Sequence, residues 1–331
     1  MFKKFLLLLT LHSLQACAQQ SGYSVEKTYK IPGPGGWDYI RMHKGKLYVS
    51  HSTQVNIINA ATGDSVGVIP QTTGVHGIAF DEALNRCYTS NGRLNNVTVF
   101  DLATDKVLTQ VPTGNNPDAI FFEPFTQTII TCNGSSKTLS LIDPKADKVI
   151  QTIEVGGKPE EAVSDGKGHL YVNLEDKNEV AAVDLKTNKV TARWSLGAEG
   201  PTGLAYDKAT NRLFSGCDGY LVVLNAESGK VVSKLPIGDG CDGVVFNEAK
   251  NLIYTSNGQS GNLSVIREKD ANHYAVLGNY PTKRGARTLC FDEASQTIYL
   301  PTADFEPRVG TERPKMKTGT FQVLVVTYKV K

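Results

Sequence analysis

The chain has 331 residues, with 35 Lys and Arg against 33 Asp and Glu, and its formal net charge is +2 at pH 7. A nearly neutral chain without a long basic run lacks the electrostatic footprint of a nucleic-acid-binding protein. Beyond the first residues, no segment reaches the roughly 18 consecutive apolar residues that a membrane span needs. We therefore expect neither nucleic acid nor a membrane-spanning segment to be part of its function.

The first residues predict an export signal. Two lysines at positions 3 and 4 precede a short apolar run, residues 5–11, and the segment LQAC ends at Cys17. This order of a charged region, an apolar region and small residues is typical of a cleaved signal peptide. The ending resembles a bacterial lipobox, which implies cleavage before Cys17 and lipidation of its thiol. A plain export signal cleaved nearby is the alternative.

These features divide the chain into a signal peptide (1–16), a tether (17–22) and one folded domain (23–331). Removing the signal takes away two lysines and no acid, so 33 basic and 33 acidic residues remain. We expect an exported protein of the bacterial periplasm or cell envelope whose lipid anchor is its contact with a membrane.

A strand, a turn and a returning strand recur along the chain. In residues 96–114, an alternating run is followed by Asp101, whose carboxylate can accept hydrogen bonds from the backbone N–H groups just ahead of it. An equivalent acid or amide recurs every 41 or 42 residues, at Asn59, Asp101, Asp143, Asp184 and Asn225. A constant period of this size predicts a repeat architecture.

A second column of the repeat gives the number of copies. Seven segments, among them KLYVSH, RCYTSNG and LIYTSNG, align on Tyr48, Tyr88, Ile130, Tyr171, Phe214, Tyr254 and Tyr299. Each period holds four short strand signals, which is the sheet of one propeller blade. The sequence therefore predicts an all-β fold, a seven-bladed β-propeller of four-stranded antiparallel blades.

The last repeat predicts how the ring closes. It has strand signals at 288–291, 297–301 and 321–330 but no outer strand. The segment 24–31 has no inner strands before it, so we expect it to complete the last blade and to protect its edge. Blade six carries the irregular segment REKDANHYAVLGNYPT. Blade seven carries a polar insertion, residues 302–320, which is either a lid near the channel or a solvated loop.

The repeats resemble those of the YncE-like family of exported proteins with YVTN-type β-propeller repeats, over about residues 23–331. The segments YVSH, YTSN, ITCN, YVNL, FSGC, YTSN and YLPT carry this resemblance. It implies the fold but no particular chemistry, because propellers include binding proteins, scaffolds and unrelated enzymes.

Two rings of residues are expected on one rim of the central channel, because the inner strand and the YVTN-like strand of each blade are antiparallel neighbours. The first ring is Trp37, His76, Asp118, Glu160, Thr202, Asp242 and Arg287, and the second is His51, Asn91, Asn133, Leu174, Cys217, Asn257 and Thr302. Polar residues that converge from separate blades can form a ligand pocket. The alternative is that they only fill a hydrated axis.

We predict a monomeric binding protein, rather than an enzyme, that engages a small molecule or a partner protein at this rim. The predicted binding residues are Trp37, His51, His76, Asn91, Asp118, Asn133, Glu160, Asp242, Asn257 and Arg287. A scaffold that uses its blade edges and leaves the channel empty is a further possibility.

The enzymatic alternative is a hydrolase, lyase or isomerase on a small sugar or lactone. His76 with Asp118 or Glu160 would act as its acid–base pair, since histidine titrates near neutral pH. No cofactor is expected in the binding protein. In the enzyme, Asp118, Glu160 and Asp242 offer the oxygen ligands that calcium prefers.

Five cysteines follow Cys17, and none forms a CxxC or Cys/His ligand pair, which argues against a zinc site. Cys217 and Cys241 lie at the end of one blade's second strand and at the start of the next blade's first strand. A disulfide between them is allowed if their α-carbons lie within about 7 Å of one another. Two free thiols are the alternative.

Overall fold

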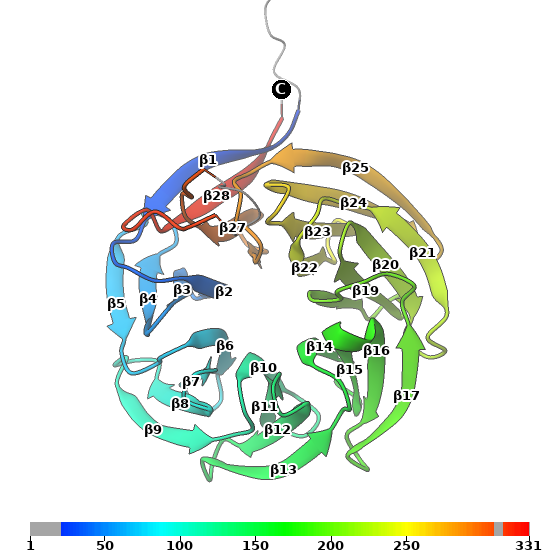
Figure 1. Cartoon of the computed structure of the whole chain (residues 1–331), viewed down its shortest axis with the longest axis horizontal. Coiled ribbons are helices and arrows are strands. Elements are labelled where there is room, and N and C mark those ends of the chain that lie inside the picture. The colour runs from blue at the N-terminus through cyan, green and yellow to red at the C-terminus, as the bar shows by residue number, and fades with distance from the viewer. Residues whose placement is uncertain (1–20, 308–313, 331) are drawn as a thin grey trace, which may run out of the picture.

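The computed structural model describes residues 21–307 and 314–330. Its strands form seven sheets of four antiparallel strands, arranged as a ring around a central channel (Figure 1). This confirms the predicted seven-bladed β-propeller. The predicted signal peptide and Cys17 lie outside the described residues. Within the described ranges, no helix is long and apolar enough to cross a membrane.

The first six blades each take four consecutive strands. Blade 1 contains β2 (Trp37–His43), β3 (Lys46–His51), β4 (Gln54–Asn59) and β5 (Ser65–Ile69). Blade 2 contains β6 (Val75–Asp81), β7 (Arg86–Asn91), β8 (Asn96–Asp101) and β9 (Val107–Pro112). Blade 3 contains β10 (Pro117–Glu123), β11 (Thr128–Asn133), β12 (Thr138–Asp143) and β13 (Lys148–Glu154).

Blade 4 contains β14 (Pro159–Ser164), β15 (His169–Leu174), β16 (Glu179–Asp184) and β17 (Lys189–Ser195), with a 3-10 turn, η1 (Glu175–Lys177), after β15. Blade 5 contains β18 (Leu204–Asp207), β19 (Arg212–Cys217), β20 (Tyr220–Asn225) and β21 (Val231–Pro236). Blade 6 contains β22 (Cys241–Asn247), β23 (Leu252–Asn257), β24 (Asn262–Asp270) and β25 (His273–Pro281).

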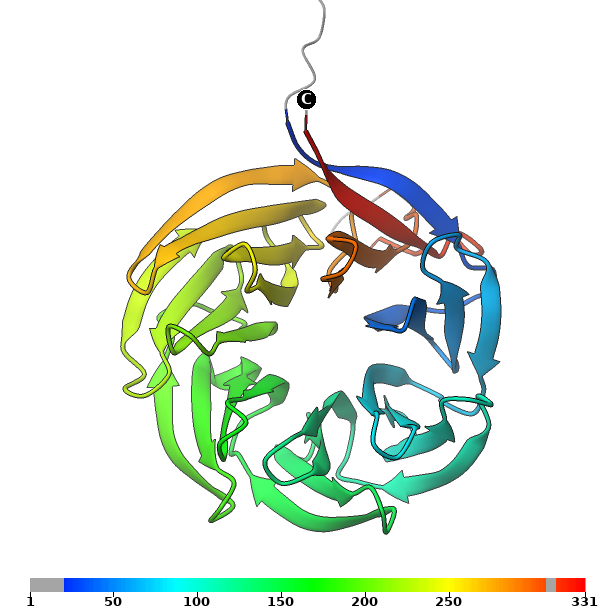
Figure 2. The ribbon, with the colours of Figure 1, turned by 180° about the vertical axis from the view of Figure 1, so that it is seen from behind.

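Blade 7 is built from both ends of the chain. It contains β26 (Cys290–Asp292), β27 (Thr297–Thr302), β28 (Gln322–Lys329) and, as its outer strand, β1 (Gly22–Lys30). The two terminal strands pair antiparallel from Gly22 opposite Lys329 to Lys30 opposite Gln322, and Figures 1 and 2 show them side by side. This confirms that the N-terminal segment supplies the missing strand and covers the edge of β28.

The hydrophobic core is divided into seven layers, one between each pair of neighbouring blades. Between blades 1 and 2, for example, the buried side chains include Tyr48, Ile57, Val75 and Phe100. The other six clusters lie in the same way between the remaining pairs of blades. Since each blade buries both faces against its neighbours, the inner strands are held in place around the channel.

The repeated acid or amide forms the turn expected of it. Asp101 Oδ1 accepts from the backbone N–H of Ala103 at 3.0 Å and of Thr104 at 2.8 Å. Asn59, Asp143 and Asn225 accept from the equivalent N–H groups in their own blades. These turns fix the return from the third strand to the fourth.

The two irregular segments have defined structures. The irregular segment of blade 6 forms a longer hairpin, with nine residues in each of β24 and β25 and two register shifts. The ends of the insertion in blade 7 pair with each other, because Phe305 forms a β-bridge with Met316 and Glu306 N–H donates to Lys315 O at 2.8 Å.

Of the two alternatives for Cys217 and Cys241, the structure has the free thiols and not the disulfide, and both thiols are buried. Cys217 points into the layer between blades 4 and 5, whereas Cys241 points into the layer between blades 5 and 6. The two thiols therefore lie on opposite sides of blade 5.

We expect thiol counting to show this. In the denatured but unreduced domain, all five cysteines after position 17 should react with a thiol reagent, and in the folded protein the reaction should be slow because all five are buried. A count of three in the denatured, unreduced domain would contradict the free-thiol assignment.

Tyr29 of β1 tests the closure of the ring. Its hydroxyl donates to the carbonyls of Ala60 and Ala61 in blade 1, at 3.0 and 2.9 Å, and its ring is buried between blades 7 and 1. Tyr29→Ala should lower the free energy of unfolding by about 3 kcal/mol, as measured by denaturant titration. Tyr29→Phe, which keeps the ring, should cost only about 1 kcal/mol. Equal losses in the two variants would show that ring packing does not hold the closure.

Candidate functional site

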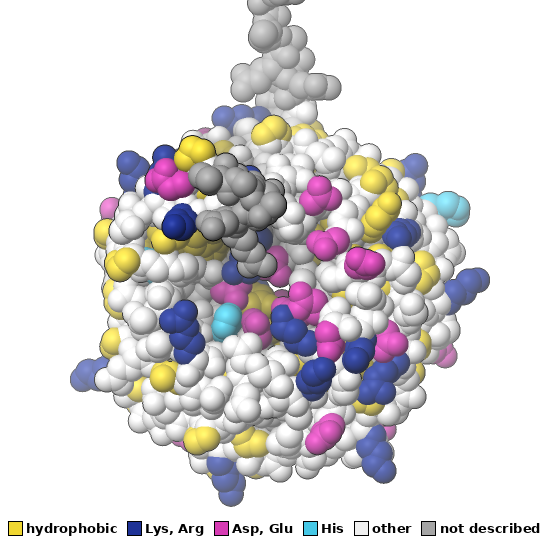
Figure 3. All heavy atoms as spheres, in the orientation of Figure 1, with side chains coloured by type: hydrophobic (Ala, Val, Ile, Leu, Met, Phe, Trp, Pro, Cys, Tyr) yellow, Lys and Arg dark blue, Asp and Glu magenta, His cyan; other side chains and the backbone are white. Residues whose placement is uncertain are grey.

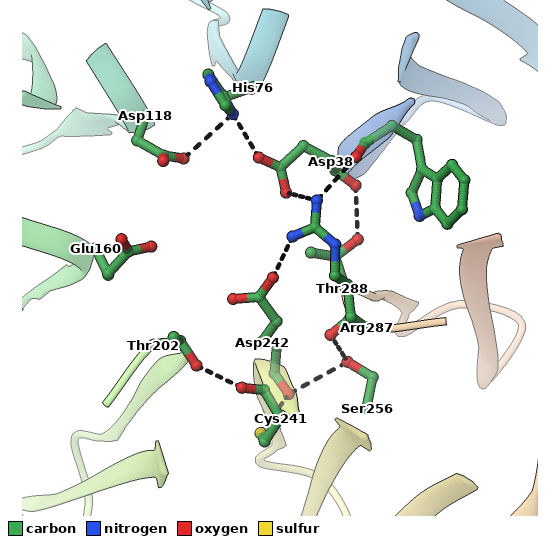
Figure 4. Close-up of polar contacts among 12 residues, drawn as sticks. Asp38, His76, Asp118, Glu160, Thr202, Cys241, Asp242, Ser256, Arg287 and Thr288 are labelled. Atoms are coloured by element: carbon green, nitrogen blue, oxygen red, sulfur yellow. Dashed lines mark hydrogen bonds and ion pairs between the residues drawn. The ribbon is translucent and has the colours of Figure 1, made fainter. Parts of the chain in front are cut away.

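One residue from each blade forms a ring around the upper mouth of the channel. In blades 1 to 4 and blade 6, the inner strand pairs at its first residue and then shifts register, as between Trp37 and Ile40 in β2. A β-bulge of this kind redirects a side chain. We call the residues at this position, together with their counterparts in blades 5 and 7, the upper ring: Asp38, His76, Asp118, Glu160, Thr202, Asp242 and Arg287 (Figure 4).

The predicted first ring was right at six of its seven positions. In blade 1 the ring residue is Asp38 and not Trp37, because Trp37 pairs with His51 just as Val75 pairs with Asn91. Trp37 instead stacks on Phe321, with ring centroids 5.6 Å apart, in the layer between blades 7 and 1. Asp38 is identified by the register of the strand pairing, in which Trp37 is the equivalent of Val75 and Asp38 is the equivalent of His76.

The second predicted ring is not accessible to a ligand. Asn91, Asn133 and Asn257 are fully buried. Each amide donates to a hydroxyl of the third strand in its own blade, which is Thr98, Ser140 and Ser264 respectively. These asparagines lock the second strand to the third, so the prediction that they bind a ligand is wrong. His51 is also buried, with Nδ1 2.9 Å from Asn56 Oδ1 and its ring against Phe321.

Side-chain hydroxyls hold the backbone of the upper ring between blades. Ser90 of blade 2 donates to the carbonyl of Asp118 in blade 3, and Ser256 of blade 6 donates to the carbonyl of Arg287 in blade 7. Thr288 of blade 7 donates to the carbonyl of Asp38 in blade 1 at 2.6 Å. Neighbouring blades are therefore joined where the ring side chains leave the backbone.

Five ring residues form a charged network on one side of the mouth. Arg287 lies between two carboxylates, with an ion pair to Asp242 and Nη2 3.2 Å from Asp38 Oδ1. His76 Nδ1 lies 2.6 Å from Asp38 Oδ2 and 3.7 Å from Asp118 Oδ1 (Figure 4). Asp38 thus has two cationic partners, whereas Asp118 has only a longer contact.

These partners lower the pKa of Asp38 and raise the pKa of His76. Burial would raise the pKa of Asp38, but the charge of Arg287 and the hydrogen bond from His76 hold it below its ordinary value. Burial by itself would lower the pKa of His76, but Asp38 and Asp118 raise it to about 9. We conclude that this pair is a carboxylate and an imidazolium at neutral pH.

The carboxylates of Asp118 and Glu160, across the mouth, have too little positive charge nearby to keep their pKa values low. Burial, together with the charge of Asp38, raises the pKa of Asp118 to about 7 even with His76 nearby. Burial and the charge of Asp118 raise the pKa of Glu160 to about 9, although Lys158 Nζ lies 2.6 Å from its Oε1. Both groups bind protons more tightly than in water, which marks an excess of negative charge.

A cavity of about 640 Å³ opens at this mouth. Its walls include Asp242 and Arg287 of the upper ring, with Glu175 and Asp218 farther out. Phe305 and Pro314 of the insertion also border it, so the described ends of the insertion lie at the channel mouth. Figure 3 shows acidic side chains gathered around a histidine at this opening.

One group could hold a metal ion in the described part of the chain. The ligand atoms of Asp38, His76 and Asp118 lie within 4.8 Å of one another. The predicted calcium set of Asp118, Glu160 and Asp242 is not brought together in this way. A metal at the observed group would have to displace the proton on His76 and compete with Arg287 for Asp38, so the residues fit a metal poorly.

The comparisons with known proteins show the fold. The chain is similar to hydrazine synthase of Kuenenia stuttgartiensis, with a TM-score of 0.71 and 14% sequence identity over 87% of this chain and 96% of that one. No protein-family model and no curated protein matches the chain. At this identity the similarity extends to the propeller and not to its chemistry.

The raised pKa of Asp118 predicts how Asp118→Asn changes stability. The folded-state pKa, about 7, lies above the ordinary 3.8, so the stabilisation from its proton is full below about pH 4 and is lost as the pH rises through 7. Asp118→Asn should therefore be about 1 kcal/mol or more stable than the natural protein at pH 8 and nearly equal at pH 4, as measured by urea unfolding. A variant destabilised at pH 8 would mean that the carboxylate is well compensated.

Proposed function

We propose that this protein is an exported β-propeller that binds a small, positively charged polar molecule in the upper mouth of its channel. The proposal rests on one observation above all: Asp118 faces the channel as a carboxylate without a hydrogen-bond partner among the described residues. It is only 9% exposed, and its nearest cationic atom is His76 Nδ1 at 3.7 Å. Leaving a buried charged group unpaired is costly, so a cation placed there would gain a strong interaction.

The surrounding charges support the same ligand class. Glu160 stands next to Asp118 in the ring, and Figure 4 shows both carboxylates directed toward the open centre. Glu175 and Asp218 add two further acids farther out on the same mouth. Arg287 and Lys158 are already paired with carboxylates. An ammonium group would therefore meet more negative than positive charge, and an anion would be repelled.

The signal-like N-terminus and the repeats complete the proposal. We infer export, cleavage before Cys17 and lipid anchoring in the cell envelope from the sequence of residues 1–17. The YVTN-type repeats support a place in the YncE-like family. We propose that the domain acts as a monomer on a small molecule rather than on a partner protein, because its charged mouth is a cavity and not a flat surface.

A matched pair of four-carbon solutes tests the ligand class. Putrescine carries two ammonium groups, and succinate carries two carboxylates in their place. We expect calorimetry at pH 7.5 and low salt to detect putrescine and not succinate. Asp118→Asn should weaken putrescine binding about tenfold or more, because a hydrogen bond to a charged group contributes about 1.5–3 kcal/mol.

The control is Asp165→Asn, which removes an acid that pairs with His169 away from the mouth. It should leave putrescine binding unchanged. Succinate binding as strong as putrescine binding, or putrescine binding that does not depend on Asp118, would refute a cation site in the upper mouth.

A hydrolase, lyase or isomerase is the second candidate, favoured by the 2.6 Å contact between His76 and Asp38. In this contact the carboxylate could orient an acid–base histidine. The position of His76 Nε2 argues against an enzyme. This nitrogen is so close to Gly92 that a Cβ atom added to the glycine would lie only 2.7 Å from it. That nitrogen therefore lies against backbone. Turnover of a small lactone that is lost in His76→Gln would favour the enzyme.

A further inference from the structure

The channel has a second mouth at its other end, which the proposed function does not use. The inner strands run from the upper ring toward this end, where a separate cavity of about 370 Å³ opens. We call it the lower mouth. Figure 2 shows the ring from behind, with the inner strands around the channel. A cavity of this size is large enough for a small organic molecule.

Tyr39 stands between the two mouths. It belongs to blade 1, yet it packs in the same buried cluster as Ala119 of blade 3 and Ala162 of blade 4. Because these blades are not neighbours in the ring, the Tyr39 side chain must cross the channel to reach them. It is 7% exposed and lines the lower mouth. Asp242 borders both cavities, so the two cavities are adjacent.

Arg41 presents an uncommitted cation to the lower mouth. Its guanidinium lies 5.4 Å from the centre of the Tyr39 ring, and its Nη2 is 3.9 Å from Glu161 Oε1. No hydrogen bond of its guanidinium occurs in the described ranges. The side chain is 31% exposed, so its hydrogen-bonding face is open to a molecule in the cavity. A guanidinium in this state can take a carboxylate through two parallel hydrogen bonds.

Glu161 does not neutralise Arg41 fully. Burial raises the pKa of Glu161 to about 7, in spite of the charge of Arg41. Near neutral pH the carboxyl is therefore partly protonated, and the separation of 3.9 Å exceeds hydrogen-bond distance. An incoming carboxylate would meet a guanidinium whose contact with its nearest acid is longer than a hydrogen bond.

The remaining walls combine apolar and polar side chains. Phe121, Phe122 and Tyr206 contribute aromatic rings, and Asp242, which already pairs with Arg287, contributes an acid. Lys208 adds a second cation at the opening. Aromatic and aliphatic walls with a few directed polar groups are typical of sites for small organic ligands, and aromatic rings favour an aromatic partner.

We propose that the lower mouth is a second binding site, specific for a small aromatic carboxylate whose acid group pairs with Arg41. The two ends of the channel then take ligands of opposite charge. The upper mouth offers the Asp118 carboxylate, whose nearest cationic atom is 3.7 Å away, and the lower mouth offers the Arg41 guanidinium, whose contact with Glu161 is 3.9 Å long. The second site does not depend on the function proposed for the first.

The test uses phenylacetate, with 2-phenylethylamine as a probe of similar shape and opposite charge. Ligand-observed NMR and calorimetry at pH 7.5 should detect phenylacetate and show at least tenfold weaker binding of the amine. Arg41→Gln should weaken phenylacetate binding about tenfold or more. Glu161→Gln should keep or strengthen it, because that variant removes the competing acid. Asp118→Asn, in the upper mouth, should have no effect on it.

Val163→Trp provides a second variant that leaves Arg41 in place. The larger ring should fill the cavity and abolish phenylacetate binding, while thermal unfolding reports whether each variant is folded. Equal affinity for the two probes, or a folded Arg41→Gln protein that binds phenylacetate within twofold of the natural protein, would overturn the proposal. If Arg41→Gln does not fold, loss of binding in Glu161→Gln would overturn it as well.

Discussion

The hydroxyl bonds between blades are the constraint on which the site depends. In five of the seven blades the ring residue leaves the backbone at a bulge, which is a point where the ladder of the sheet is interrupted. A bond such as that from Ser90 to the carbonyl of Asp118 holds this interrupted backbone from the neighbouring blade. The orientation of a ring side chain held in this way therefore depends on two blades.

Three blades that lack serine at this position form a comparable bond with another residue. Blade 5 has Gly216 at the position of Ser90, and there Thr202 donates to the carbonyl of Cys241 at 2.5 Å. Blade 7 has Pro301 at that position, and there Thr288 donates to Asp38. Blade 4 has Asn173, whose amide donates to the carbonyls of Thr202 and Gly203 at 2.9 and 3.0 Å. Different residues thus perform one structural task, which leaves the ring position free to vary.

Much of the fold was predictable because the same pattern of strands and turns occurs several times in the sequence. The blade count, the four strands of each blade and closure by the N-terminal strand all follow from the period. The ring was harder, since Asp38 is found only through a register shift that composition does not reveal. Asn91 and its equivalents were misjudged because a polar residue that locks a blade looks the same in sequence as one that faces a ligand. Tyr39 crosses the channel to blades that are distant in sequence, and no local pattern indicates that.

Closure by a non-covalent pair of terminal strands also leaves the order of the blades open to change. Because β1 and β28 lie side by side, a short linker could join the first and last described residues, and the chain could be opened at an exposed connection between two other blades. The permuted chain would keep every layer of the core and the same ring of side chains. The fold therefore depends on the order of the blades around the ring and not on which blade contains the chain termini.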